Sequence, residues 1–371
     1  MNIKKDQIRL IFFLPFWGLG GASESIFKLI NFLTKKNFSI LAVSIGKNFY
    51  KKKLKKINCE IIEINCARSI LSIVKLRKIL LIETKKKYKK NILISNIHYG
   101  NIISMISSYN IENLKILLTE RSSISELSYS KNYSQFFKNK VLYYFAKLLY
   151  KRSDLVIVNS NFEKNYISKN FKINNIKCIH PPSITKIIKL KNLIKDKKNI
   201  FRIVYVGRLS KEKGLHIILK SLSKLKKNNF TLDIYGDGPL KSEIKELINS
   251  LNLNKKIKLK GYVENKNIIY KNADLFINAS IFEGLPNSLV QSINYGVYPI
   301  CSNAPGGNLE VIKYGKLGLS FQMNNENDLY KKIMRFFNNN LKLNNSLRKK
   351  HLLKYTEKKS FFDYYKIFNN I

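Results

Sequence analysis

Several common signatures of function are missing from this sequence. Its four cysteines and four histidines form no CxxC pair and no other spacing typical of metal ligands, so we expect ordinary thiols in a reducing compartment. It has no Asp-x-Asp motif, the pair of carboxylates that could present a divalent ion. We therefore expect neither a structural metal site nor a metal cofactor.

Long hydrophobic runs are also missing. The longest uncharged apolar stretch, residues 10–22, contains Pro15 and is well short of the ~20 residues that cross a bilayer. The sequence thus predicts no transmembrane helix. Because Lys4, Lys5 and Arg9 precede this stretch, a secretory signal peptide is the alternative to a buried strand that leads into a glycine-rich turn.

Acidic residues are scarce: 24 Asp and Glu stand against 68 Lys and Arg, a net charge of +44. This charge predicts polyanionic partners or reflects a biased genome, since A/T-rich codons also produce an excess of Lys, Asn and Ile. Arginine, which nucleic-acid-binding proteins use for bidentate contacts with bases and phosphates, is several-fold rarer than lysine. We therefore expect no nucleic-acid partner.

Short apolar runs, by contrast, are abundant. Hydrophobic residues make up 45% of the chain, and runs rich in Ile, Leu and Val alternate with longer helical patterns as far as about Phe321, which is typical of parallel βαβ units. In the first half we expect one doubly wound sheet, with strands near residues 8–14, 39–43, 60–64, 92–95, 116–118, 155–158 and 177–179.

The alternation stops at residues 180–182, His-Pro-Pro, and at the lysine-rich stretch that follows. A second series of strands lies near residues 202–206, 231–235, 257–259, 275–278, 298–301 and 318–321, and the tail from about Asn327 reads as two helices. We predict two Rossmann-like α/β domains, 1–185 and 200–371 with the C-terminal helices, joined by a linker at 186–199. Two such domains facing each other would place the carboxyl ends of both sheets, where ligands bind, at a cleft.

The first chemical motif is GRLSKEKG at 207–214, directly after the strand at 202–206. Its two cations, Arg208 and Lys213, stand five residues apart on a loop that leads into a helix beginning near Leu215. Fixed positive charges and the free N–H groups of a helix start can hold an anionic diphosphate. A solvated basic loop is the alternative.

The second motif, SIFEGLPNSLVQ at 280–291, also follows a strand. Gly284 allows a tight turn, and Pro286 suits the first position of a helix whose free N–H groups would point back toward the crevice. Glu283 would then lie at the carboxyl edge of the sheet, beside the expected phosphate site. A carboxylate that only interacts with the helix dipole is the alternative.

Together with GDGP at 236–239, GYVEN at 261–265 and the stretch 273–296, these motifs resemble, in order and spacing, the large family of retaining GT-B glycosyltransferases often called family 4. The resemblance covers nearly the whole second domain. It implies a GT-B fold and an enzyme that moves a hexose or N-acetylhexosamine from a nucleotide diphosphate sugar, with UDP expected, to a glycan or lipid-linked acceptor with retention. Polysaccharide or lipopolysaccharide biosynthesis is the expected setting.

The resemblance also implies roles for matching positions. Arg208 and Lys213 would clamp the diphosphate and stabilise the leaving nucleotide, in a family that works without a divalent metal. Glu283 matches the first acid of the family's Glu-x7-Glu signature and would contact the donor sugar. The backbone of four residues would approach the sugar and phosphate, and that of one more would contact the base: Gly284, Leu285, Pro286 and Asn287, and Val263.

Two positions depart from the family pattern. Gln291 stands where the second acid of the signature normally binds the ribose hydroxyls, which leaves a neutral amide to bind them. Arg121, after the strand at 116–118, stands where many relatives carry a histidine facing the donor sugar. In the same domain Gly20 and Gly21 resemble the family's glycine loop, and His98 points toward the same edge; a plain turn and a structural histidine are the alternatives.

Residues 138–152, KNKVLYYFAKLLYKR, interleave lysines with Tyr and Leu at helical spacing. Such a helix fits the interface of an anionic membrane, as does the net charge, although a core-facing helix with solvated lysines explains the pattern equally well. We expect a cytoplasmic enzyme attached peripherally to the inner face of the membrane that carries its acceptor. The alternatives are a decayed transferase that binds anionic membranes or nucleic acid, and a nucleotide-sugar epimerase on the same fold.

Overall fold

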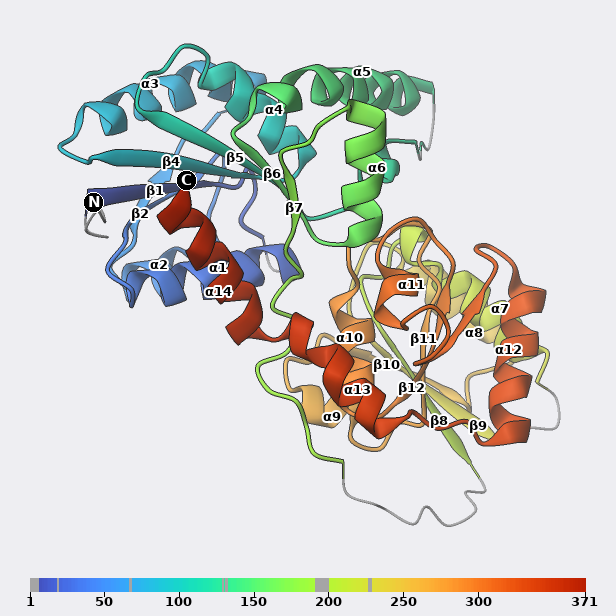
Figure 1. Cartoon of the computed structure of the whole chain (residues 1–371). Helices are drawn as coiled ribbons and strands as arrows, with labels where there is room; N and C mark the ends of the chain where they lie inside the picture. The colour runs from blue at the N-terminus through green and yellow to red at the C-terminus, as the bar shows by residue number, and fades with distance from the viewer. Residues whose placement is uncertain are drawn as a thin grey trace. The chain divides into compact units, whose positions relative to one another are not determined.

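The computed structural model of this chain describes residues 7–18, 20–66, 69–128, 130, 133–190, 200–225 and 229–371. The chain divides into two compact units: Met1–Pro182 with Lys358–Ile371, and Ser183–Glu357. In each unit helices cover both faces of one parallel sheet (Figure 1). The predicted α/β architecture of two doubly wound sheets is confirmed.

The first sheet has the strand order β3-β2-β1-β4-β5-β6-β7. Its strands are β1 Ile8–Phe13, β2 Ser39–Ser44, β3 Glu60–Glu63, β4 Lys90–Asn96, β5 Leu114–Glu120, β6 Leu155–Val158 and β7 Ile176–Cys178. The chain winds outward from β1 to β3 and then returns to β4, so the topological switch point lies between β1 and β4. All six side chains of β1 are buried, because helices cover both faces of the sheet.

Helices α1 (Gly21–Thr34) and α14 (Glu357–Asn370) pack on one face of this sheet, where their apolar side chains share a core with Leu10 and Phe12. Helices α3 (Ser72–Lys85) and α4 (His98–Ser107) pack on the other face. The remaining elements of this unit are α2 Lys51–Lys55, α5 Tyr133–Leu149, α6 Asn161–Phe171 and the short 3-10 turns η2 Ser69–Leu71, η3 Ile124–Ser128 and η4 Tyr150–Arg152.

The second sheet repeats this winding in the order β10-β9-β8-β11-β12-β13, with its switch point between β8 and β11. Its strands are β8 Phe201–Val206, β9 Phe230–Tyr235, β10 Ile257–Gly261, β11 Leu275–Asn278, β12 Tyr298–Ser302 and β13 Leu319–Phe321. One face is covered by α7 Leu215–Ser223, α8 Lys241–Ser250 and α12 Glu326–Asn339. The other is covered by α9 Lys266–Tyr270, α10 Asn287–Asn294, α11 Asn308–Val311 and α13 Asn345–Leu352.

Every predicted strand is present, with ends shifted by no more than two residues. Two expectations about the C-terminal part differ from the structure. The tail forms three helices, α12, α13 and α14, not two, and α14 belongs to the first unit rather than to the second domain. Phe361, Tyr364 and Phe368 of α14 are buried in the first unit's core. An amphipathic pattern predicts a helix, but it does not say which core the helix joins.

The predicted linker at 186–199 also differs. Its residues 186–190 belong to the second unit, which begins at Ser183. The Ile188 N–H donates to Asn294 Oδ1 at 3.1 Å, and the Ile188 carbonyl accepts from Nη2 of the buried Arg348 at 2.8 Å. These hydrogen bonds hold a polar, strandless segment against the unit, which composition does not predict. Residues 191–199 lie outside the described residues.

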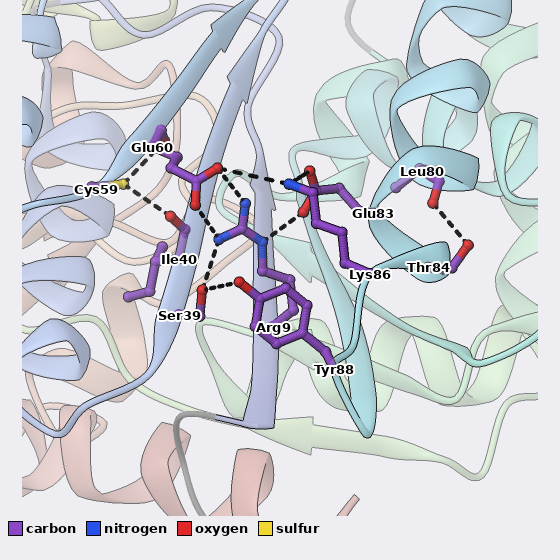
Figure 2. A network of polar contacts seen from close by, with 10 residues as sticks. All are labelled: Arg9, Ser39, Ile40, Cys59, Glu60, Leu80, Glu83, Thr84, Lys86 and Tyr88. Carbon is purple, nitrogen blue, oxygen red and sulfur yellow. Dashed lines mark hydrogen bonds and ion pairs between the residues drawn. The ribbon is translucent and has the colours of Figure 1, made fainter.

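At the amino edge of the first sheet a buried arginine ties three strands together (Figure 2). The Arg9 guanidinium donates to Glu83 Oε2 at 2.7 Å, to both carboxylate oxygens of Glu60 at 2.7 and 2.8 Å, and to Ser39 Oγ at 2.8 Å. The hydrogen bond from Arg9 lowers the pKa of Glu60. Because ligands of such sheets bind at the opposite, carboxyl edge, this network is structural.

Candidate functional site

The two predicted motifs lie on the loops after β8 and β11, which are neighbours at the switch point of the second sheet. After β8 the chain passes the exposed Arg208, forms a 3-10 turn at Lys211–Lys213 and enters α7 at Leu215, as predicted. Gly214 has a φ of +64°, and a Cβ there would lie 2.1 Å from the carbonyl oxygen of Ala279. Only glycine fits, so the first loop packs directly against the end of β11.

Packing of these loops brings Lys213 and Glu283 into contact. Lys213 Nζ lies 2.6 Å from Glu283 Oε1, and the two side chains are only 26% and 13% exposed. The same oxygen accepts a hydrogen bond from Ser280 Oγ at 2.7 Å. The switch point thus holds a fixed ammonium and an oriented carboxylate side by side. Sequence reasoning named both charges but neither their contact nor Ser280.

A third loop, after β12, supports Glu283 and was missed. The Glu283 N–H donates to the Pro305 carbonyl at 3.1 Å, and the Gly307 N–H donates to the Gly284 carbonyl at 3.0 Å. Gly306 has a φ of +121°, and a Cβ there would lie 1.6 Å from the Glu283 carbonyl oxygen. The Pro-Gly-Gly sequence at 305–307, which two residues separate from the end of β12, was the available signal for this loop.

Helix α10 begins at Asn287, and Pro286 is its N-cap rather than its first helical residue. Asn287 and Gln291 share a face of this helix, as their spacing predicts. Both contact Ser183: Asn287 Oδ1 accepts from the Ser183 hydroxyl at 2.7 Å, and Gln291 Nε2 donates to the Ser183 carbonyl at 3.1 Å. The structure therefore gives the Gln291 amide nitrogen a partner within the protein.

The other predicted residues of the second unit are placed as follows. Gly284, Leu285 and Pro286 are buried, and the carbonyl groups of Gly284 and Pro286 accept hydrogen bonds within the protein. Gly284 is not among the glycines with positive φ, so the tight turn expected of it does not need the left-handed region. Val263 follows β10 and packs partly buried against the core below α10.

In the first unit, Gly20 and His98 flank the switch point: Gly20 lies on the loop after β1, and His98 is the first residue of α4, which follows β4. Gly20 is extended, with a φ of 174°, and precedes α1, which begins at Gly21. A Cβ at Gly20 would meet nothing within 4 Å. Strain therefore does not explain this glycine, whereas the open space beside it leaves room for a ligand.

Arg121 is partly buried and His98 is buried, so neither side chain extends freely into solvent. Arg121 Nε donates to Asn96 Oδ1 at 3.3 Å, and its guanidinium lies 5.9 Å from the centre of the Tyr364 ring of α14. His98 is buried, and burial lowers its pKa to about 4. Glu120 and Glu126, which sequence reasoning missed, lie on either side of the His98 ring.

Helix α5 packs one side on the core of the first unit, as the core-facing alternative expects: Leu142, Tyr143 and Leu149 lie partly buried against the core that contains Ala146. Of its 17 residues only Asn139 and Ala146 are buried. Large apolar side chains are strongly exposed, with Tyr133 at 94%, Phe137 at 71% and Tyr144 at 60%. Within the part of the chain that the structure describes, no helix has the length and hydrophobicity needed to cross a membrane. The helix thus presents an apolar and basic surface.

Comparison with known sequences bears directly on the second unit. The sequence model of the family described as "Glycosyl transferases group 1" matches residues 185–352, the part that holds Lys213 and Glu283. This part of the chain thus matches a glycosyltransferase family.

Curated relatives extend the match to the first unit. The N-acetylgalactosamine-N,N'-diacetylbacillosaminyl-diphospho-undecaprenol 4-alpha-N-acetylgalactosaminyltransferase of Campylobacter jejuni is 28% identical over 337 residues, 87% of this chain and 88% of that protein. An uncharacterized glycosyltransferase of Methanocaldococcus jannaschii is 30% identical over 211 residues, 54% of this chain, and the match spans about half, 51%, of that relative.

Solved structures show the same fold. The crystal structure of Anabaena Alr3699/HepE in complex with UDP superposes with a TM-score of 0.77 over 98% of this chain and 100% of that one, at 17% identity. This likeness confirms the GT-B fold that the motifs predicted.

Proposed function

We propose that this glycosyltransferase moves a hexose or N-acetylhexosamine from a UDP-sugar to a glycan or lipid-linked acceptor, with retention at the anomeric carbon. The observation that carries the proposal is the contact between the Lys213 ammonium and the Glu283 carboxylate at the switch point. The ammonium and the exposed Arg208 offer positive charge to a diphosphate, and the carboxylate can accept hydrogen bonds from sugar hydroxyls. The Anabaena structure was obtained with UDP, and the C. jejuni name specifies a diphospho-undecaprenol acceptor, which supports both substrates.

The proposed chemistry uses these groups as follows. As the nucleotide leaves, negative charge grows on the diphosphate, so Arg208 and Lys213 bind the transition state more strongly than the ground state. A donor phosphate oxygen takes the acceptor proton while the sugar passes through an oxocarbenium-like state, and no protein nucleophile is needed. Glu283 would therefore act as a hydrogen-bond acceptor for the donor sugar and not as a nucleophile. Its Oε1 already accepts hydrogen bonds from Lys213 and Ser280, which orient the carboxylate.

We further propose that transfer needs no divalent metal, because the cations of Arg208 and Lys213 would stabilise the charge that develops on the leaving group, and the sequence offers no Asp-x-Asp. EDTA should leave the rate unchanged, and added magnesium or manganese should not raise it. Loss of activity on chelation that either ion restores would contradict this part of the proposal.

The acceptor is proposed to lie at an anionic membrane, with α5 as the contact. Its exposed aromatic residues can enter the interface, and its lysines, with no acid on the helix, can bind anionic headgroups. Neutralising Lys140, Lys147 and Lys151 together should reduce binding to anionic vesicles, and salt should weaken binding because it screens charges over about 8 to 10 Å. Equal binding to neutral vesicles would remove α5 from the proposal.

A donor screen tests the proposed function. UDP-, GDP- and CMP-sugars are incubated with the protein, first in water and then with a short-chain polyprenyl diphosphate that carries N-acetylgalactosamine. We expect slow hydrolysis of a UDP-sugar, faster turnover with an acceptor, and an α-linked product. Hydrolysis of none of the donors, with no UDP-dependent rise in thermal stability, would contradict the proposal.

Two variants localise the activity. Arg208→Ala and Lys213→Ala should each lower turnover by roughly one hundredfold, the loss typical of one preorganised electrostatic donor. Lys211→Ala is the matched control, because Lys211 is an exposed lysine of the same loop and should keep near-normal turnover. If all three variants behave alike, the diphosphate does not bind at this loop.

A further inference from the structure

A strained residue marks the switch point of the first sheet. Ile97, between β4 and α4, has a φ of 70° and a ψ of 139°, which is a rare outlier for a β-branched residue. Two hydrogen bonds stabilise this conformation. The Ile97 N–H donates to the Thr119 carbonyl at 2.9 Å, and the Ile97 carbonyl accepts from the Asn101 N–H at 2.8 Å. Such strain persists where surrounding structure enforces it, and it clusters at functional sites. The residue that it places is His98.

The His98 ring faces a buried carboxyl group. His98 Nδ1 and Glu120 Oε2 lie 3.9 Å apart, and both are buried without a hydrogen-bond partner among the described residues. The other oxygen, Glu120 Oε1, accepts hydrogen bonds from Asn101 Nδ2 at 3.0 Å and from the Tyr150 hydroxyl. Burial raises the pKa of Glu120 to about 8 and lowers the pKa of His98 to about 4, so both groups are neutral near pH 7. Since Oε1 already receives two donors, the carboxyl proton is best placed on Oε2, facing Nδ1.

The arrangement at Nδ1 determines whether the other ring nitrogen, Nε2, carries the proton. With the carboxyl proton of Glu120 facing Nδ1 across 3.9 Å, the imidazole proton is best placed on Nε2, which lies 3.5 Å from Glu126 Oε1. Glu126 belongs to the turn η3, and its side chain is 30% exposed. The buried Glu163 anchors the start of η3, because its carboxylate accepts from the Ile124 N–H and from the Ser123 hydroxyl, each at 2.7 Å. Glu126 is therefore a supported carboxylate that still reaches solvent.

We propose that the Glu126 carboxylate of the first unit binds a sugar hydroxyl of the acceptor, and that His98, whose ring faces the protonated Glu120, positions the Glu126 carboxylate. The inference rests on the proposed function, since it names part of the acceptor site for that reaction. Its location fits, because η3 follows β5, the neighbour of β4, at the carboxyl edge where ligands of parallel sheets bind. Its chemistry also fits, because a carboxylate accepts hydroxyl hydrogen bonds about twice as strong as neutral ones.

The first test concerns the buried pair and needs no acceptor. Imidazole ¹⁵N NMR of histidine-labelled protein, with the His98 signals assigned by their loss in His98→Gln, should show a neutral ring with its proton on Nε2 at pH 7. Glu120→Gln should leave this tautomer unchanged, because the amide keeps an N–H donor toward Nδ1. Glu120→Leu removes the donor and should shift the Nδ1 resonance. An imidazolium at pH 7, or a proton on Nδ1, would overturn the proposal even if the Leu variant does not fold.

The second test measures the acceptor. With UDP-N-acetylgalactosamine and the polyprenyl diphosphate probe used in the donor screen, Glu126→Gln should raise the acceptor KM about tenfold and leave donor hydrolysis and the donor KM unchanged. Glu112→Gln, at an exposed glutamate of the same unit, is the matched control and should change neither. Equal acceptor KM values for the two variants would overturn the proposal. If the wild-type protein shows no hydrolysis and no transfer, the proposed function fails first, while the NMR measurement still decides the arrangement of His98.

Discussion

Replacing Glu283 by glutamine should separate nucleotide binding from sugar transfer. In the structure Glu283 Oε1 takes one of the three ammonium hydrogens of Lys213, at 2.6 Å. A bound diphosphate therefore meets a lysine that is already partly engaged and a carboxylate of its own sign. Glutamine keeps the size of the side chain and a neutral acceptor for Lys213 and Ser280, but it removes the competing charge. UDP should consequently bind the variant more tightly, although sugar transfer should become much slower.

The magnitudes follow from the partial burial of the pair, with 26% and 13% of the two side chains exposed. A hydrogen bond to a charged group contributes about 1.5–3 kcal/mol when buried, and solvent screening reduces this value. We expect Glu283→Gln to tighten UDP binding by about 1 kcal/mol, roughly fivefold. Loss of the oriented contact with the sugar should lower turnover by roughly one hundredfold or more. Lys213→Ala should instead weaken UDP binding by about 2 kcal/mol, roughly thirtyfold.

Calorimetric titration of UDP measures the first effect, and turnover with the donor identified in the screen measures the second. Glu212→Gln is the control, because it makes the same charge change on the loop after β8 at a carboxylate that accepts from Ser210. Unchanged or weaker UDP binding in Glu283→Gln would show that the pair does not compete with the diphosphate. An equal gain in UDP affinity in Glu283→Gln and Glu212→Gln would show that removal of any negative charge near the site explains the effect.

Three further outcomes are expected. Gln291→Glu should lower the thermal midpoint, because a carboxylate would face the Ser183 carbonyl without the donor that now lies 3.1 Å from it, at a cost of about 1–3 kcal/mol; an unchanged midpoint would indicate that the side chain turns away, toward a ligand. Glu83→Gln should destabilise the first unit by about 2 kcal/mol in urea, since it breaks a buried contact with the arginine of β1, whereas Glu24→Gln, in an exposed pair, should stay within about 0.5 kcal/mol. The stability of Glu120→Gln relative to wild type should rise between about pH 4.5 and 8. In this range wild-type Glu120, with its pKa raised to about 8, keeps a proton in the folded chain that the unfolded chain has lost. A difference independent of pH in urea titrations would refute the raised pKa.

The sequence determined the parts of this protein that local patterns encode. Buried parallel strands are continuous apolar runs, and so every strand of both sheets could be placed before the structure was known. The loops at 207–214 and 280–291 were equally visible, because glycine and proline punctuate the chain directly after a strand and charged residues stand beside them. The doubly wound order then placed both loops at one edge of one sheet.

Only the tertiary structure decided which side chains meet. The contact between Lys213 and Glu283 spans 70 residues, and that between Gln291 and Ser183 spans 108. The pair of His98 and Glu120 joins the start of α4 to the end of β5, the strand that follows this helix. The packing of α14 in the core of the first unit is likewise decided by the tertiary structure. These contacts depend on loop packing and burial, and burial also decides the protonation of Glu120 and His98. A local pattern encodes which side chains are present at an edge, whereas the distances between them arise only when separate crossovers pack together.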